Sequence, residues 1–266
     1  MNWNKAELLA ILPQRLRKEP FDDVRELRLR AGQAPRLMTM GGIRDLSGPV
    51  QEEELRYIIN AASRYSPWNA ASMKYGYLTA PGGHRIGVCG EWEGEGLQRI
   101  SSLCIRLARD VRGIALGLPI DRDLLILGPP GSGKTTLLRD YVRILSRTMS
   151  VAVVDERGEI FPEGFSRGMG VDVLTGLRKA KGIDMVLRSM GPEVIAMDEV
   201  TEESDCAALL AAARCGVRLV ATAHASSVHD LQERSVYRPL AKSGLFSVAA
   251  VLDGNRNWHL EEVGQW

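Results

Sequence analysis

The sequence contains little cysteine, and its few cysteines form no recognisable pattern. Its 266 residues include four cysteines, none of which has the Cys-x-x-Cys spacing of zinc sites and redox motifs. This argues against a zinc site and a disulfide framework, both of which depend on cysteine number and spacing. We therefore predict that all four are small core residues with reduced thiols in a cytosolic protein. They are Cys89, Cys104, Cys206 and Cys215.

Long apolar runs and an excess of one charge are also lacking. No apolar stretch approaches the roughly 20 residues of a membrane-spanning helix, and the short amphipathic stretch at the start carries Glu7, which is atypical of a signal peptide. Lysine and arginine number 34 against 33 aspartates and glutamates. The balance argues against a nucleic-acid coat, although it leaves room for a local basic face. We expect a cytoplasmic protein that must be recruited to any membrane where it works.

Hydrophobic residues are plentiful, at 45%, so the chain can bury a core, and its length suits one to two domains. Residues 1–113 are rich in arginine and broken by glycine and proline turns. Their patterns predict a small α+β domain. The expected order is helix, strand, helix, hairpin and strand, at 5–12, 24–30, from Glu52, 76–92 and 100–109. The segment 113–123 is the expected linker.

The second part of the chain, residues 114–266, has a different texture. Four continuous apolar runs are typical of strands buried on both faces of a parallel sheet, at 124–127, 151–154, 194–197 and 219–222. Helices are expected between them, at 134–146, 183–190 and 204–215. An antiparallel hairpin over 245–263, turning at Asp253-Gly254-Asn255, is expected to close the domain. The fold class that follows is α/β.

One segment of this second domain carries a phosphate-binding motif, because LLILGPPGSGKTT (124–136) matches G-x-x-x-x-G-K-[ST] between a predicted strand and a predicted helix. Backbone N–H groups of such a loop converge on phosphates at the positive end of a helix. Lys134 is expected to meet the β- and γ-phosphates, and the Thr135 hydroxyl to ligate Mg²⁺. The predicted nucleotide-binding residues are Gly128, Pro129, Pro130, Gly131, Ser132, Gly133, Lys134, Thr135 and Thr136.

Acidic residues follow two of the predicted strands. Asp198 is expected to hold Mg²⁺ through water, and Glu199 to activate the attacking water as a general base. The alternative is an ordinary pair of acids at a strand end. After the strand 151–154, Glu156 or Glu159 could support the attacking water or the Mg²⁺ shell, and a salt-bridged loop with Arg157 is the alternative.

Histidine and arginine supply the remaining candidates. His224 follows the strand 219–222 and could sense the γ-phosphate, or it could be a structural residue. We assign no catalytic role to the other histidines, His84, His229 and His259. Arginine suits phosphate binding because its planar fork is permanently charged. The first domain offers Arg28, Arg30, Arg85, Arg99, Arg106, Arg109 and Arg112. For each one, a solvated or nucleic-acid-facing strand is the alternative to an arginine finger.

Several sequence blocks, in one order along nearly the whole chain, resemble the stage III sporulation protein AA family, ATPases encoded with sporulation channel proteins in endospore-forming bacteria. The blocks are ELRLRAGQAP (26–35), GYLTAPGGHRIGVCGEW (76–92), CIRLARD (104–110), LGPPGSGKTTLLRD (127–140), VVDERGEI (153–160), DVLTG (172–176), LRSMGPEVIAMDEV (187–200) and ATAHA (221–225). The phosphate loop and the Asp-Glu strand are generic, whereas the PGGHR hairpin and VVDERGEI are particular to the family.

The family is similar to the hexameric motor ATPases of type II and type IV secretion. The resemblance implies a RecA-like core with a smaller N-terminal domain over nucleotide at subunit boundaries. It also implies an acidic box at 155–159, a second nucleotide motif at Asp198-Glu199 and a histidine box at His224. Arg85 and Arg106 are the arginines it would place in the site.

The first hypothesis for function is an ATPase that uses ATP and Mg²⁺ to drive or assemble a membrane channel between mother cell and forespore. It would act as a hexameric ring, recruited from the mother-cell cytoplasm to the cytoplasmic parts of channel proteins. The second is a RecA-like, nucleic-acid-dependent ATPase that uses the arginine-rich domain. The third is a nucleotide-gated binding module with negligible turnover.

Overall fold

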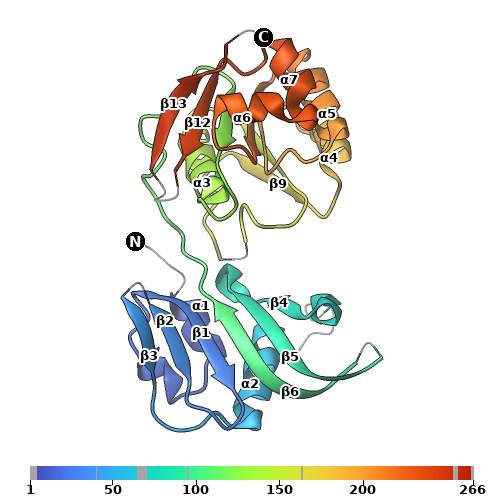
Figure 1. Cartoon of the computed structure of the whole chain (residues 1–266). Coiled ribbons are helices and arrows are strands. Elements are labelled where there is room, and N and C mark those ends of the chain that lie inside the picture. Colours follow the sequence, from blue (N-terminus) through green and yellow to red (C-terminus); the bar gives the residue numbers. More distant parts are fainter. Residues whose placement is uncertain are drawn as a thin grey trace. The chain divides into compact units, whose positions relative to one another are not determined.

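The computed structural model describes residues 5–39, 41–64, 71–94, 96–162, 164–253 and 257–264. The chain divides into two compact units (Figure 1). The N-terminal unit comprises Met1–Asp110 and Pro162–Phe165, and the C-terminal unit comprises Val111–Phe161 and Ser166–Trp266. Across the described ranges, no helix combines the length and apolar character needed to cross a membrane.

The N-terminal unit is built on a six-stranded sheet in the order β3-β2-β1-β6-β5-β4, in which all neighbours are antiparallel. Its strands are β1 (Val24–Arg30), β2 (Arg36–Thr39), β3 (Gly42–Asp45), β4 (Tyr77–Thr79), β5 (Arg85–Glu93) and β6 (Gly96–Arg106). Its helices are α1 (Lys5–Ile11) and α2 (Glu52–Ala62), with 3-10 turns η1 (Leu16–Lys18), η2 (Ala71–Tyr75) and η3 (Pro81–Gly83).

Alternation along β1 determines which face of this sheet carries the core. Leu27 and Leu29 are fully buried and join a cluster with residues of α1 and α2, including Leu8 and Ile58. Glu26, Arg28 and Arg30 alternate with them along the strand and are only half-buried. Because successive side chains of a strand point to opposite faces, the sheet has a helix-covered apolar face and a charged face.

The C-terminal unit contains a seven-stranded sheet in the order β13-β12-β7-β11-β10-β8-β9. All neighbours are parallel except β12 and β13. The strands are β7 (Leu124–Leu127), β8 (Val151–Asp155), β9 (Val171–Thr175), β10 (Val194–Met197), β11 (Arg218–Ala223), β12 (Val248–Leu252) and β13 (Trp258–Glu262). The helices are α3 (Lys134–Leu145), α4 (Lys179–Ser189), α5 (Glu203–Ala213), α6 (Val228–Glu233) and α7 (Arg238–Ser243), with a 3-10 turn η4 (Ser235–Tyr237).

Helices cover both faces of this sheet (Figure 1). Leu124 and Ile126 of β7 belong to the apolar cluster that contains the buried side of α3. Leu125 and Leu127 belong to the opposite cluster, with buried residues of α4 and α5. Burial on both faces explains why the central strands are continuous apolar runs in the sequence.

The structure confirms the predicted strand at 24–30, the 76–92 hairpin, the four apolar strands and the antiparallel terminal hairpin. Two positions of that hairpin's predicted turn, 254 and 255, lie outside the described residues. Helix α4 begins at Lys179, four residues before the predicted start at Ile183. The reason is Gly182, which weakens the helical pattern but is needed there: a Cβ at this position would lie 2.6 Å from Val154 Cγ1.

The prediction that all four cysteines are core residues was wrong for two of them. Cys206 is buried, but Cys89 and Cys215 are exposed and Cys104 is intermediate. Cys89 lies on an exposed position of β5, and Cys215 follows the end of α5. Composition alone could not distinguish these positions, because burial depends on which face of the sheet and which end of the helix each residue occupies.

Candidate functional site

The phosphate-binding motif forms a tight loop between β7 and α3. Its turns need glycine, because Gly131 and Gly133 have φ angles of 76° and 103°. Gly128 is favoured for a different reason: a Cβ there would lie 2.5 Å from Ser132 Oγ and 3.2 Å from Leu252 Cβ. The loop ends at the N-terminus of α3, a 12-residue helix whose first N–H groups have no partner within the helix. This is a ready anion site.

Inside the loop, one polar side chain lacks a partner. Ser132 is buried, and its hydroxyl makes no hydrogen bond to any described residue. A buried unpaired hydroxyl is costly unless a ligand satisfies it. Oxygen-rich phosphates at the start of α3 would supply such an acceptor, so the loop residues fit the nucleotide predicted from the sequence.

Lys134 is buried to 7% exposure at the first position of α3. Its ammonium donates hydrogen bonds to Gly128 O (2.8 Å) and Pro129 O (3.0 Å), and lies 2.9 Å from His224 Nδ1. Burial lowers the pKa of Lys134, and the nearby charges of Glu199 and Asp198 oppose that shift. Two carbonyl groups and an imidazole nitrogen thus hold the ammonium, and the oxygens of a bound phosphate could take their place.

The two residues predicted to hold the metal are brought together by the fold. Thr135 Oγ1 lies 3.3 Å from Asp198 Oδ2, and Thr222 Oγ1 donates to Asp198 Oδ1 at 3.0 Å. Across the described part of the chain, no cluster of three or more histidine, cysteine, aspartate or glutamate side chains could hold a metal. A hydroxyl and one carboxylate suit Mg²⁺, which completes its shell with water and substrate phosphates.

The predicted base and the predicted sensor are in direct contact. His224 Nε2 lies 2.6 Å from Glu199 Oε1. Because the ammonium of Lys134 can only donate, Nδ1 of a neutral His224 accepts, and its Nε2–H donates to Glu199. The imidazole therefore bridges the phosphate-loop lysine and the candidate base. Strand β11, which lies between β7 and β10, puts His224 in this position.

Asp155, the last residue of β8, makes structural contacts. Its buried carboxylate accepts from Glu159 N (2.9 Å) and Ile160 N (2.8 Å), which closes the loop on itself. Burial raises the pKa of Asp155, and these amide donors oppose the shift. Glu156 and Glu159 are exposed. Glu156 forms an ion pair with Lys179 at 3.4 Å.

The two candidate arginines belong to the N-terminal unit and are exposed. The guanidinium of Arg85 lies over the ring of Tyr77, 4.4 Å from its centre. Arg106 lies 3.6 Å from Glu26 on the neighbouring strand. Both are thus oriented by partners inside their own sheet, and their role at a nucleotide stays a prediction.

Three residues that contact the site were not predicted: Thr222, Tyr237 and Lys179. Thr222 binds Asp198 and also accepts from Glu199 N at 3.0 Å. The hydroxyl of Tyr237 accepts from His224 N at 3.3 Å and donates to Val200 O at 3.2 Å. A signal for Thr222 was present, because it is a polar residue within the apolar run 219–223 of β11.

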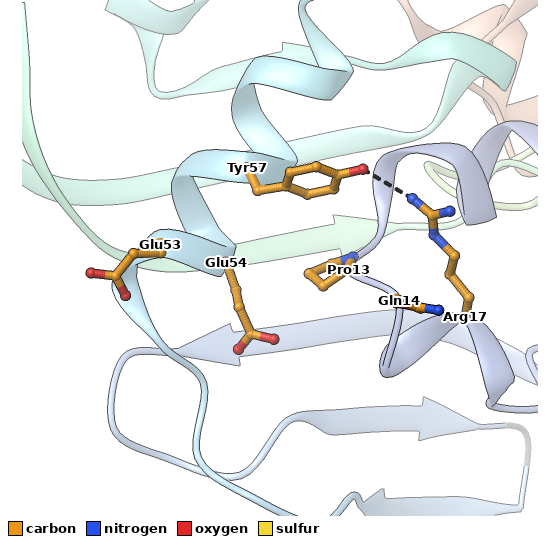
Figure 2. Close-up of a pocket in the computed structure, with 6 residues that line it drawn as sticks. All are labelled: Pro13, Gln14, Arg17, Glu53, Glu54 and Tyr57. Carbon is orange, nitrogen blue, oxygen red and sulfur yellow. Dashed lines mark hydrogen bonds between the residues drawn. The ribbon is translucent and has the colours of Figure 1, made fainter.

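A shallow hollow in the N-terminal unit lacks comparable chemistry (Figure 2). It is lined by Pro13, Gln14, Arg17, Glu53, Glu54 and Tyr57. Arg17 donates to the Tyr57 hydroxyl at 2.9 Å, and Glu54 is paired with Arg15. Two of its three charged side chains, Arg17 and Glu54, are already bound to other residues of the protein, so the phosphate loop is the stronger candidate site.

Solved structures with the same fold include motor ATPases. The Legionella pneumophila ATPase DotB matches with a TM-score of 0.60 at 20% identity, over 86% of this chain and 72% of its own. The pilus retraction motor PilT with bound ADP matches with a TM-score of 0.63 at 16% identity, over 85% of this chain and 74% of its own. These matches confirm the predicted fold: an α/β, RecA-like P-loop core with a smaller N-terminal α+β domain.

Sequence comparison identifies the family. A profile of the family described as sporulation stage III, protein AA, matches residues 4–259. The stage III sporulation protein AA of Bacillus subtilis (strain 168) is 34% identical over 272 aligned residues, which cover 90% of this chain and 88% of the relative. The chain therefore belongs to the sporulation stage III protein AA family.

Proposed function

We propose that this protein is a Mg²⁺-dependent ATPase that hydrolyses ATP to ADP and phosphate. The observation that carries the proposal is the meeting of three chain segments at the carboxyl edge of one parallel sheet. Lys134 and Thr135 come from the phosphate loop, Asp198 and Glu199 follow β10, and His224 follows β11. Ligands of open α/β folds bind at this edge.

ATP binding would be the work of the loop and its lysine. Loop N–H groups and the Ser132 hydroxyl would donate to phosphate oxygens, and Lys134 would exchange its carbonyl partners for the β- and γ-phosphates. Thr135 would bind Mg²⁺ directly and Asp198 through water. When bound, the ion would neutralise charge that develops on the phosphates.

Glu199 would act as general base. Its carboxylate would accept a proton from water as the water oxygen bonds to the γ-phosphorus and the bond to the β–γ bridging oxygen breaks. His224, which hydrogen-bonds Glu199, would orient that carboxylate. Glu156 and Glu159, on the loop after β8, are the acids that would support the water or the Mg²⁺ shell.

The family supports a proposal for the assembly and partners of this motor. We propose a hexameric ring in which Arg85 or Arg106 completes a nucleotide site at a subunit boundary. When every subunit contributes such a residue to its neighbour, the contacts are head-to-tail, and head-to-tail contacts that close form a ring. The partners would be the cytoplasmic parts of sporulation channel proteins. ATP hydrolysis in the mother cell would then drive or assemble that membrane channel.

A nucleic-acid-dependent ATPase is the second candidate. The observation in its favour is the charged face of the N-terminal sheet, where Arg28 and Arg30 accompany Arg85 and Arg106. Glu26 opposes it, because that carboxylate is paired with both Arg28 and Arg106. Tight, salt-sensitive binding of single-stranded DNA or RNA would favour this candidate over the channel motor.

The testing experiment combines phosphate release with mass measurement in solution, with and without a slowly hydrolysed ATP analogue. The wild type should release phosphate only with Mg²⁺ present and should form a larger assembly with the analogue. Lys134→Ala should lower turnover by about a hundredfold or more, because it removes a charged donor from the phosphates. ATP binding without any turnover in the wild type would instead support a nucleotide-gated binding module.

A further inference from the structure

Lys179 occupies an unusual position for a lysine. It is the first residue of α4, where the helix dipole disfavours a positive charge. Its side chain is nevertheless only 12% exposed. A cation held almost out of solvent at the positive end of a helix requires compensating partners.

Three elements supply those partners. The ammonium of Lys179 lies 3.4 Å from Glu156 Oε2, in the loop after β8, and 3.4 Å from Asp205 Oδ2, in the first turn of α5. It also donates to Thr201 Oγ1 at 3.2 Å, in the segment after β10. One hydrogen bond and two ion pairs therefore compensate the charge of this ammonium.

Asp205 extends this contact into the backbone next to the candidate base. Its carboxylate is buried and accepts from Thr201 N (2.9 Å) and Glu202 N (3.2 Å). On the other side of the same segment, Glu199 N donates to Thr222 Oγ1 and Val200 N to Thr222 O. The backbone from 199 to 202 is therefore fixed at one end by Thr222 and at the other by Asp205.

We propose that Lys179 is a positioning residue for ATP hydrolysis. It holds Glu156 in place directly, and through Asp205 and Thr201 it holds the backbone that carries Glu199. The inference rests on the proposed function. Lys179 acts through these groups, since its partners lie in the loop after β8, the segment after β10 and the first turn of α5.

Removal of this ammonium should affect catalysis more than binding. Asp205 would become a buried carboxylate without its cation, which weakens its hold on Thr201, and Glu156 would lose its partner. Lys134 and Thr135 come from α3 and keep their own contacts. In Lys179→Met we expect kcat to fall about tenfold or more with KM changed less than about threefold, because small misplacements of reacting groups are costly.

The kinetic experiment compares Lys179→Met, Lys179→Arg and a control, Lys181→Met, an exposed lysine on the same helix. Circular dichroism selects folded variants. Lys179→Arg keeps the charge and should recover part of the lost kcat, and the control should resemble wild type. A folded Lys179→Met with wild-type kcat overturns the proposal, as does an equal loss of kcat and of ATP affinity.

If Lys179→Met does not fold, Lys179→Arg and Glu156→Gln carry the kinetic test: both should lower kcat at nearly constant KM, and wild-type kcat in both overturns the proposal.

Amide exchange without nucleotide tests the positioning even if the wild type hydrolyses no ATP. The amides of Thr201 and Glu202 should exchange about tenfold faster in Lys179→Met than in wild type, because Asp205 accepts from both. Amides of β12 report global stability and should change little. Unchanged exchange at Thr201 and Glu202 overturns the positioning role, whereas absent wild-type turnover with faster exchange at these amides overturns only the proposed function. When Lys179→Met does not fold, the same comparison is made on Lys179→Arg, where a smaller acceleration is expected and unchanged exchange counts against the proposal.

Discussion

Glu199 is held by more contacts than an ordinary acid on the protein surface. Its backbone N–H is held by Asp198 and Thr222, each at 3.0 Å, and its carboxylate meets His224. A side chain with both its backbone and its carboxylate fixed is oriented before substrate arrives. Orientation of this kind makes general-base catalysis efficient.

Glu199→Gln should therefore separate binding from hydrolysis. The amide keeps the size of the side chain but cannot accept the proton of water, so turnover should fall by about 10²–10⁴ while ATP affinity stays near wild type. Phosphate release and equilibrium binding of a fluorescent ATP analogue measure the two effects. Wild-type turnover in this variant would contradict the assignment of Glu199 as base.

At the scale of elements, the position of α4 depends on a close approach to β8. Gly182 lies on the buried side of α4, where a Cβ would be 2.6 Å from Val154 Cγ1. Valine is stiff at χ1, so the methyl cannot easily move aside. Lys179, which forms an ion pair with Glu156, is the first residue of the same helix, so the close contact at Gly182 also helps to position Lys179.

Gly182→Ala brings two opposing effects. Alanine favours a helix by about 1 kcal/mol over glycine, whereas overpacking a core costs about 1–3 kcal/mol. With a contact this short, we expect overpacking to win and the variant to lose about 1 kcal/mol or more of unfolding free energy. Urea denaturation measures the change.

The matched control for this prediction removes the clashing methyl groups. In a Val154→Ala background, the same Gly182→Ala substitution should no longer destabilise the protein, because the space beside β8 is open. If Gly182→Ala costs the same in both backgrounds, the close approach is not the cause.

At the scale of the whole molecule, the proposed catalysis and the proposed assembly involve two units with separate cores. The phosphate loop belongs to the C-terminal unit, as do Asp198 and His224, which contact Thr135 and Lys134. The exposed arginines proposed to complete the site belong to the N-terminal unit. In the proposed ring their contribution would come from a neighbouring subunit, so it should be absent from ATP binding by a single subunit.

Arg106→Ala should lower turnover in the assembled protein about tenfold or more, because an arginine that stabilises the transition state contributes at least that much. ATP affinity should change little. Arg25→Ala, an exposed arginine of the same sheet, is the control. Phosphate release measured above and below the concentration at which the protein assembles shows whether the loss of turnover requires assembly. An equal loss of turnover and of ATP affinity would count against Arg106 as an arginine finger.

The sequence alone determined the parts of this protein that are encoded by contiguous residues. The phosphate loop is such a part: its glycines, Lys134 and Thr135 lie in one run, and the turn needs positive φ at fixed positions. The apolar strands were equally clear, because burial on both faces excludes polar residues along the whole run. The acids at the ends of β8 and β10 followed from those strands.

Only the tertiary structure decided which strand lies beside which. It put β11 between β7 and β10, which brings Thr222 to Asp198 and His224 between Lys134 and Glu199. It also brought Lys179 to three segments that are remote in the chain. The physical reason is that strand pairing and burial of charge depend on contacts between distant residues, and no local pattern of residues records them.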